Sequence, residues 1–533
     1  MHLTQPLQRA LRMRPDEPMT ICGDQVRTTR EIGDRVARLG GALRQLGVVE
    51  GDRVGILAMN SSMYHETLYA TWWVGAVSHG VNTRWSTAEI VYSLVDAGTK
   101  VLFIDDSFLA IVPKLCADAP SLKTVVYCGN RATPEGCLGY EQLILASDPI
   151  EDVRMGGQQP AVLFYTGGTT GAPKGVLLSH QGVMTSTFGG QVAHNAARQE
   201  GVTLVSAPLF HIAALGSWNA QNLVGGAQLF VPSFQPEAVL AAIEKHRVTT
   251  MMLVPTMLQM LVDHPERDLY DLTSVRTVGY GASPMSQAVL ERVMSAFPES
   301  EFYQGYGMTE TGMITILGKQ DHVGEGARLR SAGRSTPHFE IRIVDANDED
   351  VSAGSVGEII CRGDSLMLGY WNLPTETAAV LRDGWMYTGD MGYLDKGGYV
   401  YVVDRAKDMI ITGGENVYSA EVENAVAAHP SVTACAVVGV PDSYWGERVH
   451  AVVVLKVATA ADETEIREFV RTRIAGYKVP RSVEFIDQLP LTASGKVLKR
   501  TLRERHMDNL AQAESSSTTD FDNRAVGGES THA

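Results

Sequence analysis

The segment TGGTTGAPKG, residues 166–175, brings glycines, threonines, a proline and one lysine together in a short stretch. Glycine and proline both disfavour a helix and a central strand, so the segment predicts a loop. Backbone amides of such a loop can approach an anion closely, and Lys174 adds a mobile positive charge. Because apolar, strand-like runs flank it, AVLFY before and VLLSH after, the segment is typical of a phosphate-binding loop between two strands.

This loop differs from the P-loop of nucleoside triphosphatases. That motif requires Gly-Lys followed by Ser or Thr and leads into a helix, whereas Pro173 precedes Lys174 here and a strand-like run follows. A surface hairpin explains the isolated segment equally well, so its interpretation depends on the rest of the chain.

Further segments with the same mixture of glycine and polar residues follow along the chain. In order they are APLFH (207–211), GYGASP (279–284), YQGYGMTETG (303–312), VGEI (356–359), YTGD (387–390), DRAKDMIITGGENVYSAEVE (404–423) and LPLTASGKVLKR (489–500). Together with the phosphate loop, and in this order, they resemble the signatures of the adenylate-forming (AMP-binding) superfamily, in its acyl-CoA synthetase or fatty-acid–CoA ligase branch. The resemblance spans the chain to about residue 505.

The helices and strands that we expect to carry these residues alternate along the chain. From about residue 20 to 160, and again from 200 to 320, helical patterns alternate with short β-branched runs, which predicts βαβ units around parallel sheets. Short strands with close turns between 339 and 403 predict a small β subdomain. We therefore expect an α/β fold: a large N-terminal domain of parallel α/β subdomains plus a small β subdomain, and a smaller, mobile α+β C-terminal domain.

The length of the chain, 533 residues, exceeds what one hydrophobic core usually supports. We place the N-terminal adenylate-forming domain at 1–403, a hinge at 404–408, the C-terminal lid domain at 409–510 and a disordered tail at 511–533. The charged segment DRAKD marks the hinge. A helix is expected to begin near Ser419, because acidic residues follow in what would be its first turn.

Composition restricts the partners and the compartment. The formal net charge of −16 argues against nucleic acid or an anionic membrane held by bulk electrostatics. The six cysteines are scattered without a Cys-x-x-Cys pair, which argues against a disulfide framework or a structural zinc site. Neither a secretory signal nor an apolar segment long enough to span a bilayer is evident. The sequence therefore predicts a cytoplasmic protein that captures anionic ligands with local loops.

The resemblance implies an enzyme that joins AMP to a carboxylate with loss of pyrophosphate and then lets the thiol of coenzyme A displace the AMP. Both the acid and ATP are anionic, so the site must neutralise charge and align attack. The implied nucleotide-binding residues are Thr166, Gly168, Thr169, Thr170, Gly171 and Lys174 at the phosphates, Gly281, Ala282, Ser283 and Tyr306 at the adenine, and Asp390 and Arg405 at the ribose.

The resemblance also implies a magnesium site. Glu310 would organise Mg²⁺ together with Thr166, and Thr309 would donate its hydroxyl to the α-phosphate. A hard cation bound by one carboxylate and phosphate oxygens is what magnesium prefers. Judged on the residues alone, MTE fits a capped helix N-terminus equally well, and Asp390 fits a turn residue.

Five further positions are implied to act in the two half-reactions. Lys496 would stabilise the negative charge that develops between the carboxylate and ATP during adenylation. Lys407 matches the hinge about which the small domain pivots between adenylation and thioester formation. Gly413 and Gly414 would then line the passage for the pantetheine arm of CoA. His211 would lie at the mouth of the acyl pocket, and no general-base role follows for it.

Three positions depart from the family's pattern. Gly167 stands where many relatives carry serine, which removes one phosphate donor, and Ser419 replaces the usual proline at a helix start. Ala213 occupies the place where plant coumarate ligases carry a tyrosine that faces the phenol of the substrate. The small side chain puts hydroxycinnamates in doubt and favours a deeper, more apolar pocket.

We therefore expect an AMP-forming acyl-CoA synthetase for a medium- or long-chain fatty acid or a similarly apolar acid. The alternatives are an aryl- or cinnamoyl-type CoA ligase and a stand-alone adenylation domain that loads a carrier protein. A catalytically inactive binding protein is disfavoured because Lys496, Glu310 and Asp390 are all present. The expected partners are the acid, ATP with Mg²⁺, and CoA; a homodimer is compatible with the family.

Overall fold

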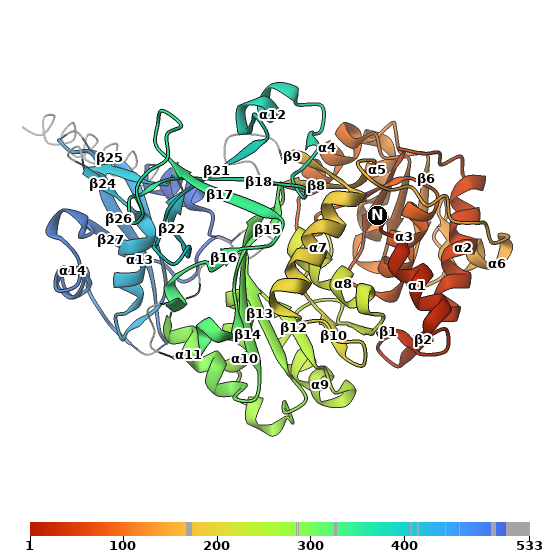
Figure 1. The fold of residues 1–533 in the computed structure, drawn as a ribbon, viewed down its shortest axis with the longest axis horizontal. Coiled ribbons are helices and arrows are strands. Elements are labelled where there is room, and N and C mark those ends of the chain that lie inside the picture. The colour runs from red at the N-terminus through yellow and green to blue at the C-terminus, as the bar shows by residue number, and fades with distance from the viewer. Residues whose placement is uncertain are drawn as a thin grey trace, which may run out of the picture. The chain divides into compact units, whose positions relative to one another are not determined.

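A computed structural model describes residues 1–166, 173–283, 285, 287–324, 328–405, 408–412, 415–442, 444–457, 459–491 and 497–507. The chain divides into two compact units. The large unit comprises residues 1–388 and 392–402, and the small unit comprises residues 389–391 and 403–533. Figure 1 labels their helices and strands.

The first sheet of the large unit carries the strands from the middle of the chain. The neighbours β14, β13, β12, β10, β11 and β1 are paired in parallel, whereas β15, β16 and β2 add antiparallel strands at the edges. The order across the sheet is β16 (Arg334–Ser335), β15 (Gly312–Leu317), β14 (Glu301–Met308), β13 (Thr277–Gly281), β12 (Thr250–Leu253), β10 (Val202–Val205), β11 (Ala227–Phe230), β1 (Pro18–Cys22) and β2 (Gln25–Thr28).

Helices cover this sheet on both faces. The buried residues of α9, α10 and α11 join those of β10 to β13 in one apolar cluster, while α7 and α8 contact β15 from another side (Figure 1). Coverage on both faces explains why β12 and β13 are buried along their whole length. The helices are α7 (His180–His194), α8 (Ile212–Val224), α9 (Pro236–His246), α10 (Pro255–Val262) and α11 (Gln287–Ala296).

The second sheet is formed mainly by the first 180 residues. Its strands from β8 to β7 are parallel, and β9 and β19 add an antiparallel edge. The order is β19 (Gly369–Tyr370), β9 (Lys174–Ser179), β8 (Pro160–Thr166), β4 (Val77–Gly80), β3 (Arg53–Leu57), β5 (Val101–Ile104), β6 (Thr124–Tyr127) and β7 (Leu138–Gly139). Around it lie α1 (Gln5–Met13), α2 (Thr29–Gln45), α3 (Ser62–Trp73), α4 (Thr87–Ala97), α5 (Val112–Asp118), α6 (Tyr140–Ala146) and α12 (Pro374–Val380).

Local signals in the sequence set several of these boundaries. The helices α2 and α4 both begin with a capping box, Thr28 with Glu31 and Ser86 with Glu89. The predicted strands on both sides of the phosphate loop are confirmed as β8 and β9, which pair in antiparallel register. Among the described residues, no helix is long and apolar enough to cross a membrane.

The predicted small β subdomain is confirmed as a third sheet. Its order is β17 (Phe339–Val344), β18 (Gly357–Gly363), β21 (Trp385–Leu394) and β20 (Leu381–Arg382), with β22 (Val400–Arg405) paired to β21. The small unit is α+β: β24 (Glu415–Val417), β23 (Ile410–Thr412), β26 (Gly446–Leu455) and β25 (Val432–Asp442) form a sheet, and β27 (Ser482–Phe485) pairs with β26. Its helices are α13 (Ser419–Ala427), α14 (Glu463–Arg471) and the helical residues 499–507.

Candidate active site

The adenine candidates lie where parallel strands end, the usual ligand edge of an open α/β sheet. Gly281 is the last residue of β13 and pairs with Gly305 on β14. A Cβ atom on Gly281 would lie 2.3 Å from the carbonyl oxygen of Gly305, so only glycine allows the strands this approach. Ala282 follows with φ 65°, a left-handed conformation that costs a non-glycine residue about 1 kcal/mol or more.

Tyr306 and Ser283 complete this group. Tyr306 lies on β14, is half-buried and packs against two apolar clusters of the large unit. Ser283 is half-buried in the connection between β13 and α11. The structure thus places all four adenine candidates at or near the ends of two neighbouring strands, and their role at the adenine stays a prediction.

The magnesium candidate Glu310 lies in the turn that joins β14 to β15. It is 6% exposed, and its carbonyl oxygen accepts a hydrogen bond from the Met367 amide at 2.7 Å. Its carboxylate Oε1 accepts a hydrogen bond from the Tyr370 hydroxyl at 2.8 Å. Thr309, directly before it, is half-buried. A buried carboxylate oriented by a hydroxyl is a suitable ligand for a hard cation such as Mg²⁺.

The phosphate-loop candidates Thr166 and Lys174 are cross-strand partners at the mouth of β8 and β9. The Thr166 hydroxyl donates to the carbonyl oxygen of Lys174 at 3.5 Å. The Lys174 Nζ atom lies 5.1 Å from the centre of the Tyr370 ring, within the range of a cation–π contact. The remaining loop candidates, Gly168, Thr169, Thr170 and Gly171, lie outside the described residues.

Tyr370 therefore links the two charged candidates, and the sequence analysis missed it. Its hydroxyl contacts Glu310 and its ring contacts Lys174. Burial and the neighbouring Glu310 raise the pKa of Tyr370, so the hydroxyl keeps its proton and donates. β19 places the side chain by pairing with β9, with Tyr370 opposite Val176. The available signal was an aromatic pair directly after a glycine, in LGYW.

Tyr370→Phe is expected to lower kcat/KM for ATP by about 10-fold, because it removes a hydrogen bond to a charged carboxylate, worth roughly 1.5 kcal/mol. Steady-state kinetics at several Mg²⁺ concentrations measure the effect. Tyr399→Phe is the matched control, since its hydroxyl donates to a different carboxylate, Asp321, at 2.6 Å. Equal kinetics for Tyr370→Phe and the wild type would contradict a role for Tyr370 at the nucleotide.

The acyl-pocket candidate His211 is the residue before α8. It is half-buried, and its ring lies 4.5 Å from that of Phe210, centre to centre. Ala213 occupies the first turn of the same helix and is also half-buried.

The ribose candidates lie together within the small unit. The Arg405 Nε atom lies 3.1 Å from Asp390 Oδ1, and the Asp390 side chain is 8% exposed. The ion pair holds the carboxylate in place beside a half-exposed guanidinium. Lys407, Gly413, Gly414 and Lys496 lie outside the described residues, so their roles stay predictions.

Ser419, read from the sequence as a simple change at a helix start, is fully buried in a polar network. α13 begins at this residue, as predicted. Its hydroxyl donates to Asp404 Oδ2 at 2.6 Å, its backbone amide donates to the same oxygen, and its Oγ accepts from Lys499. A proline at this position could make neither bond to Asp404.

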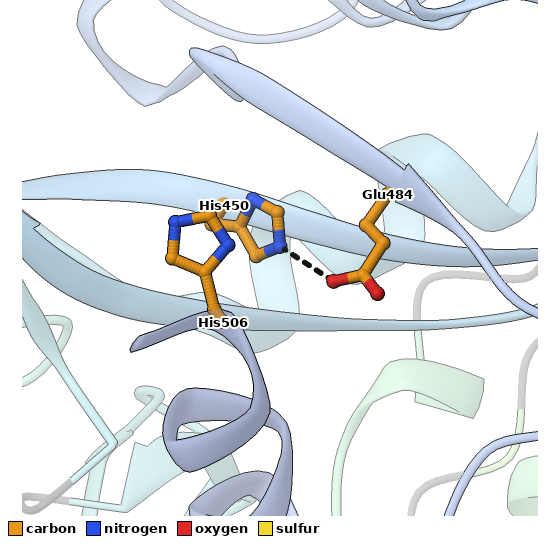
Figure 2. Close-up of side chains that lie close together, drawn as sticks. All are labelled: His450, Glu484 and His506. Carbon is orange, nitrogen blue, oxygen red and sulfur yellow. Dashed lines mark ion pairs between the residues drawn. The ribbon is translucent and has the colours of Figure 1, made fainter. Parts of the chain in front are cut away.

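Within the part of the chain that the structure describes, one group of three side chains has metal-ligand types close together: His450, Glu484 and His506 (Figure 2). Each already has a polar neighbour. His450 Nδ1 pairs with Ser482, His506 Nε2 lies 3.1 Å from Arg448 Nη2, and Arg505 pairs with Glu484 at 2.9 Å. The positive charges of these two arginines would repel a divalent cation at this place. The group is therefore explained by polar packing between β26, β27 and the helical residues 499–507.

Two family profiles match the chain, one in each unit. The profile of the AMP-binding enzyme family covers residues 7–371, and that of the AMP-binding enzyme C-terminal domain covers residues 421–496. The chain belongs to the AMP-binding enzyme family. It has the family's α/β fold, with a large N-terminal and a small C-terminal domain, and the predicted class of AMP-forming acid–thiol ligases is confirmed.

Individual members of the family resemble the chain over most of its length. A feruloyl-CoA synthase of Amycolatopsis sp is 41% identical, over 94% of this chain and 98% of that one. A medium/long-chain-fatty-acid–CoA ligase of Mycobacterium tuberculosis is 36% identical, over 95% and 90%. The crystal structure of the anthranilate CoA ligase AuaEII with anthranoyl-AMP superposes with a TM-score of 0.88 at 26% identity, over 96% and 98%.

Proposed function

We propose that the protein is an ATP-dependent aryl–CoA ligase that adenylates a planar aromatic carboxylic acid of the hydroxycinnamate class and then transfers the acyl group to CoA. Similarity to a feruloyl-CoA synthase at 41% identity, over nearly the full length of both chains, is the observation that carries the choice of acid. Side chains around β13 and β14 support it.

Three glycines make one face of β13 and β14 flat. Gly279 and Gly281 are two residues apart on β13 and therefore lie on the same face of the sheet. Gly305 of β14 pairs with Gly281. We call these three residues the glycine face. Met313 from β15 lies over it, because a Cβ atom on Gly305 would be 3.2 Å from the Met313 Cε atom. A flat face under a thioether suits a planar ring better than a flexible chain.

The amino end of the glycine face is closed by an aromatic stack. The Tyr303 ring crosses Gly279, where a Cβ atom would lie 2.2 Å from the ring carbon Cζ. His194 of α7 stacks on Tyr303 with centres 3.9 Å apart and planes at 6°. Gly281 and Gly279 are two residues apart, which is ~7 Å along a parallel strand. That length fits an aromatic ring, whereas a long acyl chain would meet Tyr303.

His194 offers a donor for a ring substituent. Burial lowers its pKa to about 4, so the ring is neutral at pH 7. Its Nδ1 accepts a hydrogen bond from the Ala196 amide at 3.1 Å, which leaves the proton on Nε2. A Cβ atom on Gly190 would lie 3.7 Å from that Nε2, on the side of Met313. In this proposal His194 recognises a phenol or methoxy oxygen at the far end of the acid.

The proposed chemistry assigns a task to each charged group. Lys174 and Thr166 bind the phosphates, and Asp390 with Arg405 orients the ribose. Glu310 and Thr166 would hold Mg²⁺, which neutralises phosphate charge when bound. Tyr370 orients the Glu310 carboxylate. Glycine-rich backbone at Gly281 lets the nucleotide approach the strand ends, while Lys496 is assigned to the developing charge on the acid.

Tyr303→Ala is expected to change the preferred acid. Removing the ring opens the end of the glycine face, so kcat/KM for decanoate relative to ferulate should rise by about 10-fold or more. The control is Phe302→Ala, whose side chain points to the opposite face and packs with a different cluster. Both truncations remove a buried ring and cost about 3–5 kcal/mol of stability, but only Tyr303→Ala should change the ratio. An unchanged ratio would contradict the assignment of Tyr303 as the residue that closes the glycine face.

A fatty acid is the second candidate substrate. The short side chain of Ala213 beside His211 favours it, as does the 36% identity to a fatty-acid–CoA ligase. A wild-type preference for decanoate or longer acids over ferulate and cinnamate would establish this alternative.

A further inference from the structure

One aspartate on α4, Asp96, is bonded to β8 and to the residue that follows β19. The Tyr165 hydroxyl on β8 donates to Asp96 Oδ2 at 2.5 Å. The indole Nε1 of Trp371, directly after β19, donates to the Asp96 carbonyl oxygen at 2.9 Å. Asp96 therefore joins two segments that are far apart in the chain. We call Asp96, Tyr165 and Trp371 the Asp96 network.

Three nucleotide-site residues are neighbours of this network in the chain. One follows Tyr165 and one precedes Trp371. The third precedes Gly175, whose carbonyl oxygen accepts a hydrogen bond from the Trp371 amide at 2.7 Å. In this order they are Thr166, Tyr370 and Lys174. The backbone beside each of these side chains is therefore held by the network or by a direct bond to it.

The aromatic members of the network pack on the strand that carries Lys174. Tyr165 is buried, and it is the cross-strand partner of Gly175. A Cβ atom on Gly175 would lie 3.0 Å from the Tyr165 ring carbon Cζ and 3.2 Å from the Trp371 Cβ atom, so both side chains lie against β9 there. Burial and the hydrogen bond to Asp96 raise the pKa of Tyr165, so its hydroxyl keeps its proton and donates.

The network fixes β8 and β9 at the ends that border the phosphate loop. A binding group whose backbone is already held loses less conformational freedom when its ligand arrives. We infer that Asp96 is a positioning residue for the outer phosphates of ATP, because its partners hold the backbone beside Thr166 and Lys174. The inference rests on the proposed function, in which these two side chains bind the phosphates.

The consequence differs between two nucleotides. ATP carries the two outer phosphates that AMP lacks, and the adenine candidates lie on another sheet, at β13 and β14. Loosening the ends of β8 and β9 should therefore weaken the binding of ATP and spare that of AMP. A merely structural tyrosine would instead lower the competent fraction of the protein for both nucleotides equally. The ratio of the two Kd values therefore separates positioning from stability.

The experiment compares Tyr165→Phe with Tyr127→Phe in the full-length protein. Tyr127 ends β6 of the same sheet, is buried, and donates its hydroxyl to a different aspartate, Asp106, also at 2.5 Å. Equilibrium dialysis with labelled MgATP and labelled AMP, without any carboxylic acid substrate, gives the two Kd values. We expect Tyr165→Phe to raise the Kd for MgATP about 10-fold and that for AMP less than about twofold. Tyr127→Phe should match the wild type for both nucleotides.

Two substitutions of Asp96 complete the test. Asp96→Asn keeps a side-chain oxygen that can accept from Tyr165, so it should retain most of the affinity for MgATP. Asp96→Ala keeps the carbonyl oxygen that Trp371 bonds but removes that acceptor, so it should reproduce the selective loss. Equal losses for both nucleotides, or an unchanged ratio in Tyr165→Phe, would overturn the inference. Absence of MgATP binding by the wild type would instead reject the nucleotide site itself, and the proposed function with it.

Discussion

Glu310→Gln is expected to lower kcat for adenylation by about 100- to 1,000-fold, the usual cost of losing one group that stabilises charge at a reacting centre. The substitution is nearly isosteric, and glutamine can still accept the hydrogen bond from Tyr370 that Glu310 accepts at 2.8 Å. What it removes is the negative charge that Mg²⁺ would need. Pyrophosphate exchange across a Mg²⁺ titration measures the effect.

The control for Glu310→Gln is Glu301→Gln at the other end of β14. Glu301 is half-exposed and pairs with Lys319 at 3.0 Å, so its loss should cost at most about 1 kcal/mol of stability and leave the kinetics unchanged. Exchange by Glu310→Gln within about threefold of the wild type at saturating Mg²⁺ would contradict the role assigned to the buried carboxylate.

Lys496→Ala is expected to reduce adenylation by at least about 100-fold and to leave thioester formation from supplied feruloyl-AMP within about threefold of the wild type. The physical reason is that a cation beside the attacking carboxylate and the α-phosphate acts only while negative charge develops there. Single-turnover assays of each half-reaction separate the two effects.

Lys478→Ala serves as the matched control for Lys496→Ala. Lys478 is a lysine of the same unit that pairs with Glu421 at 2.7 Å in a partly buried position, so its loss should lower stability but leave the ratio of the two half-reactions unchanged. Comparable losses of both half-reactions in Lys496→Ala would contradict the assignment of Lys496 to adenylation, because they would indicate a fold defect or a role in CoA binding.

Elements could be predicted from the sequence where the signal and the element lie next to each other in the chain. Apolar runs beside the phosphate loop became β8 and β9, and the acidic first turn after Tyr418 became α13. In both cases the sequence signal and the element that it predicts lie within a few residues of one another. The parallel pattern of the sheets followed from the alternation of helical and β-branched runs.

The contacts that were missed join segments far apart in the chain. Tyr370 reaches Glu310 only because β19 pairs with β9, and no local pattern predicts that pairing. Tyr303 was part of a recognised motif, yet its stacking on His194 depends on how α7 lies across β14. The small side chain of Ala213 therefore suggested a deep acyl pocket. Tyr303, the residue that we propose limits the length of the acid, lies on a different element, β14.

Ser419 illustrates a different limit. Comparison with the family's usual proline suggested a neutral change at a helix start, since proline is favoured at the first helical position. The hydroxyl proved to be buried between Asp404 and Lys499. Burial and partner identity, which decide the value of a hydroxyl, depend on the tertiary structure.

The proposed function is tested by incubating the full-length protein with ATP, Mg²⁺, CoA and either ferulate or decanoate, and quantifying AMP and the acyl-CoA product together. We expect equimolar AMP and feruloyl-CoA, with kcat/KM for ferulate about 100-fold or more above that for decanoate. Turnover that peaks on decanoate, or ferulate-dependent pyrophosphate exchange without any CoA thioester, would contradict it.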